Sequence, residues 1–207
     1  TMEVSIRAVN LIVILNIIFD SNECTSMDKK CIMDIIIEHG FFIVNNLEIG
    51  IGSSKLVAGN HYLANISALS IIGMSFEGFV DSKYWQKVGV KSLEDAMKWM
   101  VNGEGFYFES STSYHRYALE LFLYPYIFAK SFQLKFSKNY SRKLKSMADI
   151  ISDIKTPNDT IPQIGDNDDG RLLILNYPDK NNINNFVSIF FIFLWKKRRS
   201  RIQSKKK

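Results

Sequence analysis

The segment FESSTSYHRY, residues 108–117, gathers side chains suited to acid–base chemistry and anion binding directly before an apolar run, ALELFLYPYIF. Tyr114 and His115 can donate or accept a proton, and the guanidinium of Arg116 can hold a carboxylate or sulfate. Such polar crowding indicates the rim of a binding site. The plain structural alternative is a Ser/Thr cap followed by a helix that packs Tyr114 and Tyr117 into the core.

A second helix start, GNHYLANISAL at 59–69, carries Asn60 and His61. Asn is among the best N-cap residues, so a cap is the plain interpretation of Asn60. The first turn of a helix also suits an anion, because unpaired backbone N–H groups and the helix dipole point there. Two helix starts that both present proton donors and acceptors favour a functional site over two independent caps.

The elements that must position these residues are helices. Apolar residues recur at helical spacing over most of the first 155 positions, and no proline precedes Pro125. Successive helices with short connectors predict an all-α fold of stacked antiparallel hairpins: a bundle, a solenoid or a closed toroid. The helices are expected at about 4–19, 28–44, 60–76, 92–103, 111–130 and 138–154.

Local signals define several of the expected helix ends. Ser92, with Glu94 and Asp95 after it, is interpreted as a capping-box start, and His39 with Gly40 as a helix end. A kink is expected at Pro125. After residue 156 the chain becomes rich in Asn, Asp, Pro and Gly, which predicts an irregular C-terminal segment.

The charge distribution argues against nucleic acid as a partner. The formal net charge is +5, but residues 196–207 hold eight basic residues and no acidic one, which leaves −3 for residues 1–195. A basic tail therefore accounts for the basic pI. The apolar stretches 11–19 and 186–195 are shorter than the roughly 20 residues that span a bilayer, so a membrane role is not expected.

The sequence contains no complete metal-binding or nucleotide-binding motif. Cys24 and Cys31 with three isolated histidines make no zinc pattern, and the glycines of 50–52 make no nucleotide-binding loop. A calcium loop counted from Asp166 would need Gly and Glu where Arg171 and Tyr177 stand. A tight acidic turn in which Arg171 pairs with neighbouring Asp side chains is the preferred interpretation.

Four ordered blocks resemble the heparinase II/III family of polysaccharide lyases: MEVSIRAVN (2–10), SSKLVAGNHYLANISAL (53–69), FYFESSTSYHRYALELF (106–122) and IPQIGDNDDGRLL (161–173). The resemblance covers about residues 1–177. It implies an incomplete (α/α) toroid domain over 1–177, followed by an atypical apolar and then basic tail over 178–207. No cofactor and no metal are implied.

The resemblance also implies a function: β-elimination of a uronic-acid-containing polysaccharide, of the heparin, heparan sulfate or alginate kind. In the family an Asn, often with an adjacent His, binds the uronate carboxylate, which matches Asn60 and His61. A catalytic Tyr matches Tyr114, and His115 and Arg116 become candidates for substrate binding. A phenol with a pKa of about 10 is a poor base in water, so nearby cations would have to favour its ionised form.

The chain also departs from the family pattern. A catalytic His of the family comes from a C-terminal β-sandwich domain that has no counterpart here, so we expect a fragment that is inactive alone. The implied partner is an acidic polysaccharide, and such substrates predict a periplasmic or secreted protein. The alternative function is a non-catalytic carbohydrate-binding or scaffolding domain, in which Asn60 is a cap and Tyr114 a core aromatic.

Overall fold

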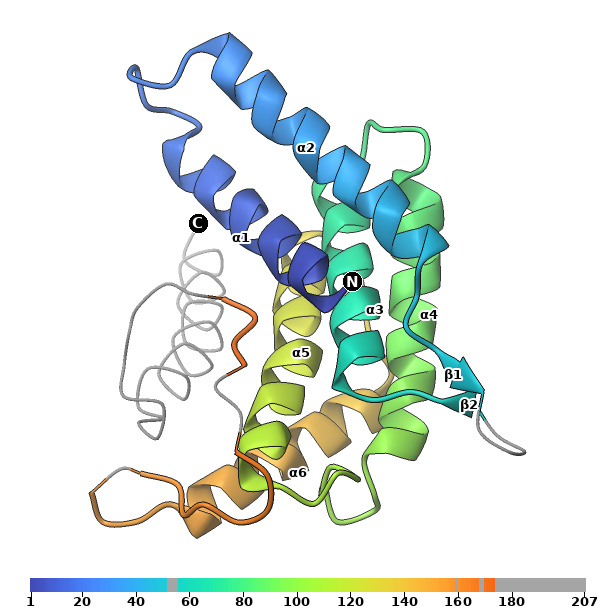
Figure 1. Cartoon of the computed structure of the whole chain (residues 1–207), viewed down its shortest axis with the longest axis vertical. Coiled ribbons are helices and arrows are strands. Elements are labelled where there is room, and N and C mark those ends of the chain that lie inside the picture. Colours follow the sequence, from blue (N-terminus) through green and yellow to red (C-terminus); the bar gives the residue numbers. More distant parts are fainter. Residues whose placement is uncertain (52–55, 159, 168–169, 174–207) are drawn as a thin grey trace, which may run out of the picture.

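The computed structural model describes residues 1–51, 56–158, 160–167 and 170–173. Helices dominate this part of the chain, and an antiparallel ribbon of two short strands joins the second helix to the third (Figure 1). In chain order the elements are α1 (Met2–Ile18), α2 (Ser26–Asn45), β1 (Gly50–Ile51), β2 (Leu56–Val57), α3 (Asn60–Ser75), α4 (Ser82–Met100), α5 (Thr112–Ser131) and α6 (Lys138–Ile154).

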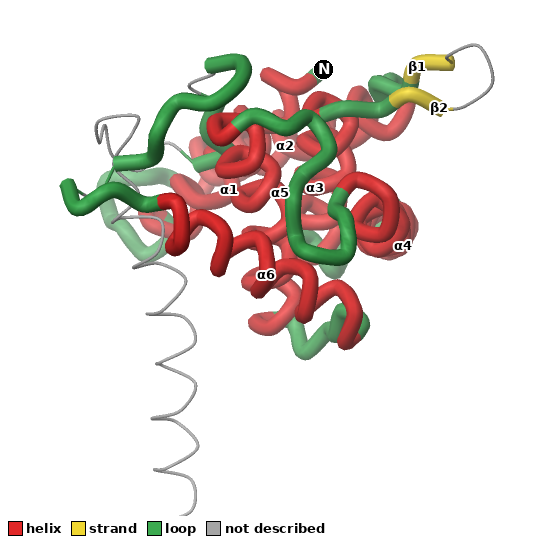
Figure 2. The backbone as a smooth tube through the Cα atoms, turned by 90° about the horizontal axis from the view of Figure 1, so that it is seen from below, coloured by secondary structure: helices red, strands yellow, loops and turns green. Residues whose placement is uncertain are grey.

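The central helix is α3, which packs against α1, α2, α4 and α5. Nearly every residue of α3 is buried, as expected for a helix that is apolar or small-sided all round. Consecutive helices run antiparallel in the pairs α1–α2 and α3–α4, while α6 crosses α5 obliquely (Figure 1). The β-ribbon projects from the side of the helices (Figure 2). This arrangement confirms the expected all-α fold of an incomplete (α/α) toroid.

Two glycines allow α3 and α4 to approach closely. A Cβ atom on Gly73 of α3 would lie 2.3 Å from the backbone nitrogen of Gln86. A Cβ atom on Gly89 of α4 would lie 2.5 Å from the backbone nitrogen of Ser70. These distances are far below normal contact, so any side chain at either position would force the helices apart.

Most helix positions agree with the sequence-based expectation, and α6 agrees at both ends. The expected start at Ser92 is wrong, because Ser92 lies inside α4, which begins ten residues earlier. Asp95 does not cap a helix: its carboxylate contacts Lys91 and Lys98 at 2.7 Å each, as intrahelical pairs three and four residues apart.

The expected helix end at His39 and Gly40 is also wrong. Helix α2 continues to Asn45, and Gly40 lies against the indole ring of Trp85, which a Cβ atom would meet at 2.7 Å. Glycine serves here to admit a large ring and not to stop the helix. Among the described residues, no helix has the length and apolarity needed to cross a membrane. The tail segment 186–195 lies outside them.

Candidate functional site

The polar run before α5 holds the C-terminal segment of the described chain. Ser111 is the N-cap of α5, and its hydroxyl accepts a hydrogen bond from the N–H of Tyr114 at 3.3 Å. The same hydroxyl donates to the carbonyl of Asp166, and the Thr112 hydroxyl donates to the carbonyl of Pro162 at 2.9 Å. The predicted cap is therefore confirmed, but these hydroxyls bind the protein's own backbone instead of forming an open rim.

His115, predicted to bind substrate, is 5% exposed and bonded on both ring nitrogens. Its Nδ1 accepts a hydrogen bond from the backbone N–H of Tyr107 at 3.3 Å, and its Nε2 lies 3.0 Å from the carbonyl oxygen of Met147. These partners require the neutral tautomer with the proton on Nε2. Both nitrogens are occupied, so the structure does not support His115 as a substrate ligand.

This arrangement makes the stability of the protein sensitive to acid. Burial lowers the pKa of His115 below its ordinary value of 6.5, although the bond to Met147 acts in the opposite direction. Below pH 6.5 the unfolded chain therefore binds a proton at His115 more readily than the folded chain does. The free energy of unfolding consequently decreases as the pH decreases. We expect this decline between about pH 7 and pH 5 to be weaker in His115→Gln.

Urea unfolding at a series of pH values measures this difference directly. His39 and His61 are present in both proteins, so the difference between the two pH profiles isolates residue 115. Parallel profiles for the wild type and the variant would contradict the assignment of a neutral, buried imidazole.

Arg116, the other predicted substrate ligand, is 3% exposed and belongs to a buried ion network. One guanidinium nitrogen lies 2.8 Å from a carboxylate oxygen of Glu120, and another donates to the carbonyl of Gly170 at 2.9 Å. Arg171 contacts the same oxygen of Glu120 at 3.1 Å, and the other oxygen accepts from the N–H of Leu172. The substrate-binding role of Arg116 is not supported, because its charge fixes residues 170–172 on α5.

The start of α3 differs from expectation in one respect. Gly59 is the N-cap, and Asn60 is the first helical residue, so the side chain of Asn60 does not cap the helix. The backbone N–H of Asn60 donates to Oε1 of Glu109 at 3.3 Å. Within the described part of the chain, the side-chain amide of Asn60 has no hydrogen-bond partner. It is therefore available to a ligand.

Glu109 joins the starts of α3 and α5. Its Oε1 atom also accepts a hydrogen bond from the Tyr107 hydroxyl at 3.0 Å. Burial, then the Glu109 carboxylate, raises the pKa of Tyr107 far above its ordinary value, with smaller effects of Tyr117 and Tyr114. Tyr107 is therefore a neutral hydrogen-bond donor that fixes the orientation of Glu109.

Asn60 and Tyr114 stand in the first turns of two helices that begin at the same end of the molecule (Figure 1). Tyr114 is half-buried and packs against the core on one side. The structure thus brings the two helix starts together through Glu109. That the amide and the phenol line one open trough stays a prediction.

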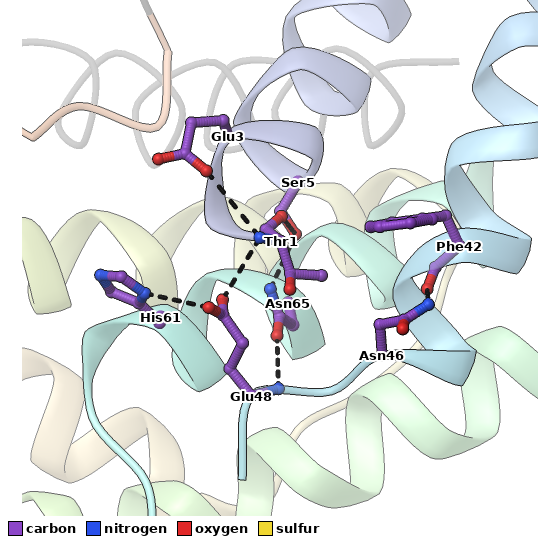
Figure 3. Close-up of polar contacts among 8 residues, drawn as sticks. All are labelled: Thr1, Glu3, Ser5, Phe42, Asn46, Glu48, His61 and Asn65. Atoms are coloured by element: carbon purple, nitrogen blue, oxygen red, sulfur yellow. Dashed lines mark hydrogen bonds and ion pairs between the residues drawn. The ribbon is translucent and has the colours of Figure 1, made fainter.

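His61 is held by a chain of polar contacts that the sequence did not reveal (Figure 3). Its Nδ1 lies 3.2 Å from Oε1 of Glu48. The backbone N–H of Glu48 donates to the side-chain oxygen of Asn65 at 3.0 Å, and the Asn65 amide donates to the hydroxyl of Ser5 at 3.1 Å. Asn65 is fully buried in α3, so it anchors the loop that carries Glu48.

The Glu48–His61 contact has an electrostatic consequence. Burial alone would raise the pKa of Glu48, but the hydrogen bond to His61 and nearby positive charge outweigh it and lower the pKa below 4.5. Glu48 is therefore an anion at neutral pH, and its carboxylate can only accept a hydrogen bond from the facing Nδ1–H of His61. Sequence reasoning could have found Glu109, because it lies in the segment 106–122 at the start of the polar run. It had no means of finding Glu48, which lies in a loop without a recognisable motif.

Antiparallel helical hairpins in this order define the class of the fold, an incomplete (α/α) toroid. The chain belongs to the heparinase II/III family, because the family model described as "Heparinase II/III N-terminus" matches residues 1–191. A curated relative, the heparin-sulfate lyase of Pedobacter heparinus, is 33% identical over 110 residues, which are 52% of this chain and 17% of that protein.

Solved structures of similar proteins share the fold of this chain. The heparan sulfate lyase HepC from Pedobacter heparinus is 25% identical, with a TM-score of 0.60 over 81% of this chain and 26% of that one. Heparinase III is 21% identical, with a TM-score of 0.65 over 76% of this chain and 23% of that one. The chain thus spans about a sixth of the curated relative and about a quarter of the solved structures.

The family resemblance drawn from the four sequence blocks is confirmed by these comparisons. The domain boundary expected at residue 177 stays a prediction. The family model extends to residue 191, and the described residues end at 173.

Proposed function

We propose that this chain forms the substrate-binding part of a lyase that cleaves uronic-acid-containing polysaccharide of the heparan sulfate kind by β-elimination. The observation that carries the proposal is the junction at Glu109, which ties the start of α3, with Asn60, to the loop that leads into α5, with Tyr114. Family membership and the names of the relatives support the choice of polysaccharide.

The reaction explains why an amide, an imidazole and a phenol would be needed together. Removal of the C5 proton builds negative charge next to the uronate carboxylate. The amide of Asn60 and the imidazolium form of His61, which carries protons on both ring nitrogens, stabilise that charge by donating hydrogen bonds to the carboxylate. Tyr114 takes the C5 proton when it is a phenolate, or donates its proton to the departing oxygen when it is a phenol. The C5–H electron pair forms the C4=C5 double bond as the C4–O bond breaks.

Glu48 acts as a positioning residue in this proposal. With Nδ1 of His61 held by the carboxylate of Glu48, the Nε2 edge of the ring faces away from the contact and is free to meet a substrate. The half-exposed ring of His61 suits this role, since a buried imidazole such as His115 could not reach a polymer.

Turnover would use a further catalytic histidine from a β-sandwich domain, and the residues described here would supply the polysaccharide-binding part of the site. The partner is an acidic polysaccharide, and the protein would act where such polymers occur, in the periplasm or outside the cell.

A binding experiment tests the proposal on the chain itself. Calorimetric titration with a heparan sulfate oligosaccharide should show binding that weakens in Asn60→Ala and in His61→Ala. Each variant loses hydrogen bonds to a charged group, so we expect a decrease in affinity of roughly tenfold to a hundredfold.

Asn45→Ala is the matched control, because Asn45 is an exposed asparagine of α2 whose side-chain amide donates to the carbonyl of Phe41. Equal affinity of all variants would remove the α3 start from the binding site. Tighter binding of an alginate oligosaccharide than of heparan sulfate would replace the proposed substrate. Cleavage-free binding by a longer protein that includes the sandwich domain would favour the non-catalytic carbohydrate-binding alternative.

A further inference from the structure

A rigid hairpin connects α4 to the polar run before α5. Val101 pairs with Tyr107 as an antiparallel bridge, and the N–H of Asn102 donates to the carbonyl of Phe106 at 3.0 Å. The turn is closed by the side-chain oxygen of Asn102, which accepts hydrogen bonds from three successive backbone N–H groups, those of residues 104–106, at 2.8–3.0 Å. The hairpin therefore holds its side chains in fixed directions.

The aromatic residues of this hairpin alternate between the core and the surface. Tyr107 points inward and is 2% exposed, whereas Phe108, the next residue, is 48% exposed. This is the alternation of an extended chain, in which neighbouring side chains lie on opposite faces. Trp99, in the last turn of α4, is 49% exposed, and its ring centroid lies 5.8 Å from that of Phe108. We refer to Trp99 and Phe108 as the aromatic pair.

The aromatic pair belongs to the chain segment that leads to the candidate site. The N–H of Phe108 donates to the carbonyl of Met100 at 2.9 Å, which fixes Phe108 beside the end of α4. The next residue, Glu109, accepts the hydrogen bond from the N–H of Asn60. The chain thus passes directly from the exposed ring of Phe108 to the group that joins the starts of α3 and α5.

Two large rings kept half-exposed on a rigid support indicate a binding surface, because exposed aromatic surface is costly in water. The carbon-bound hydrogens on the face of a pyranose ring form an apolar surface of matching size. The rings of a polysaccharide repeat along the polymer, so a sugar near Asn60 has neighbours that extend past the hairpin.

We propose that the aromatic pair is a subsite that stacks on a sugar ring of the polysaccharide next to the uronate bound at Asn60. This inference rests on the proposed function, since it assigns a second contact to the same polymer. The subsite recognises the uncharged face of the sugar, and it makes affinity depend on the length of the oligosaccharide.

Ligands of two lengths test the subsite on the intact chain. Titrations would compare glucuronate, a single sugar, with a heparan sulfate octasaccharide, using the wild type and the double variant Trp99→Ala/Phe108→Ala. We expect the double variant to bind the octasaccharide roughly tenfold more weakly, with its affinity for glucuronate unchanged. Trp99→Phe should retain most of the preference for the octasaccharide, because it keeps an aromatic ring.

Tyr84→Ala is the matched control, since Tyr84 is an exposed aromatic residue near the opposite end of α4. Wild-type binding that is lost in Asn60→Ala but unchanged in the double variant would overturn the subsite and leave the proposed function standing. An altered oligomeric state in the double variant, with unchanged binding, would assign the pair to a protein interface and also overturn it. No binding by the wild type would contradict both proposals.

Discussion

Replacement of Glu120 by glutamine is expected to lower the free energy of unfolding by roughly 3–5 kcal/mol, because it leaves a buried arginine without its counter-charge. The Glu120 carboxylate contacts Arg116 at 2.8 Å and Arg171 at 3.1 Å, and both Glu120 and Arg116 are almost inaccessible to water. Chemical unfolding followed by circular dichroism measures the change.

Asp95→Asn provides the comparison, since Asp95 also contacts two basic residues but lies on the surface of α4. Exposed pairs contribute about 0–1 kcal/mol, so this variant should unfold almost like the wild type. Combining Glu120→Gln with Arg116→Met should cost less than the sum of the single changes, because the second removes the unpaired charge. A loss as small for Glu120→Gln as for Asp95→Asn would show that the network is not a major source of stability.

Replacement of Tyr114 by phenylalanine is expected to reduce β-elimination by about two to four orders of magnitude, the usual contribution of a general acid–base group. The measurement uses a longer protein that contains this sequence together with its sandwich domain, and follows the ultraviolet absorbance of the unsaturated uronate product. Affinity for the polysaccharide should change little, because the ring and its packing against the core are retained.

Tyr117→Phe is a control for this experiment, as Tyr117 lies one helical turn further along α5 and is 1% exposed. An undiminished rate in Tyr114→Phe would remove the phenol from the mechanism, while leaving the binding role of Asn60 and His61 open to its own test.

Sequence periodicity located most of the helices, because apolar residues recur at the positions that face the core. Helix α3 is buried nearly all round, and α6 buries one apolar edge after its Ser137 cap. The errors arose where one signal has two meanings. Ser92 and Asp95 have the spacing of a cap but lie inside α4, where Asp95 pairs with lysines of the same helix. Gly40 has the residue type of a helix stop but faces an indole ring.

The candidate site was less accessible to sequence reasoning, since its contacts are long-range. The polar run does mark the start of α5, as predicted. Its side chains, however, bind distant parts of the chain: Ser111 and Thr112 bind backbone groups about 50 residues away, and Arg116 binds the carbonyl of Gly170. Such partners leave no local pattern. Asn60 and His61 were indicated by their place at a helix start and by the family resemblance. The carboxylates that contact them, Glu109 and Glu48, appeared only in the folded chain.

The position of Glu109 changes how an anion would be received at α3. Its carboxylate already binds the N–H of Asn60, where the positive end of the helix dipole would otherwise attract an external anion. An incoming uronate therefore meets a resident negative charge, which repels it unless side chains such as His61 supply compensation. The polymer would be admitted by its fit to a few donors, and a small free anion such as phosphate would gain little from this end of the helix.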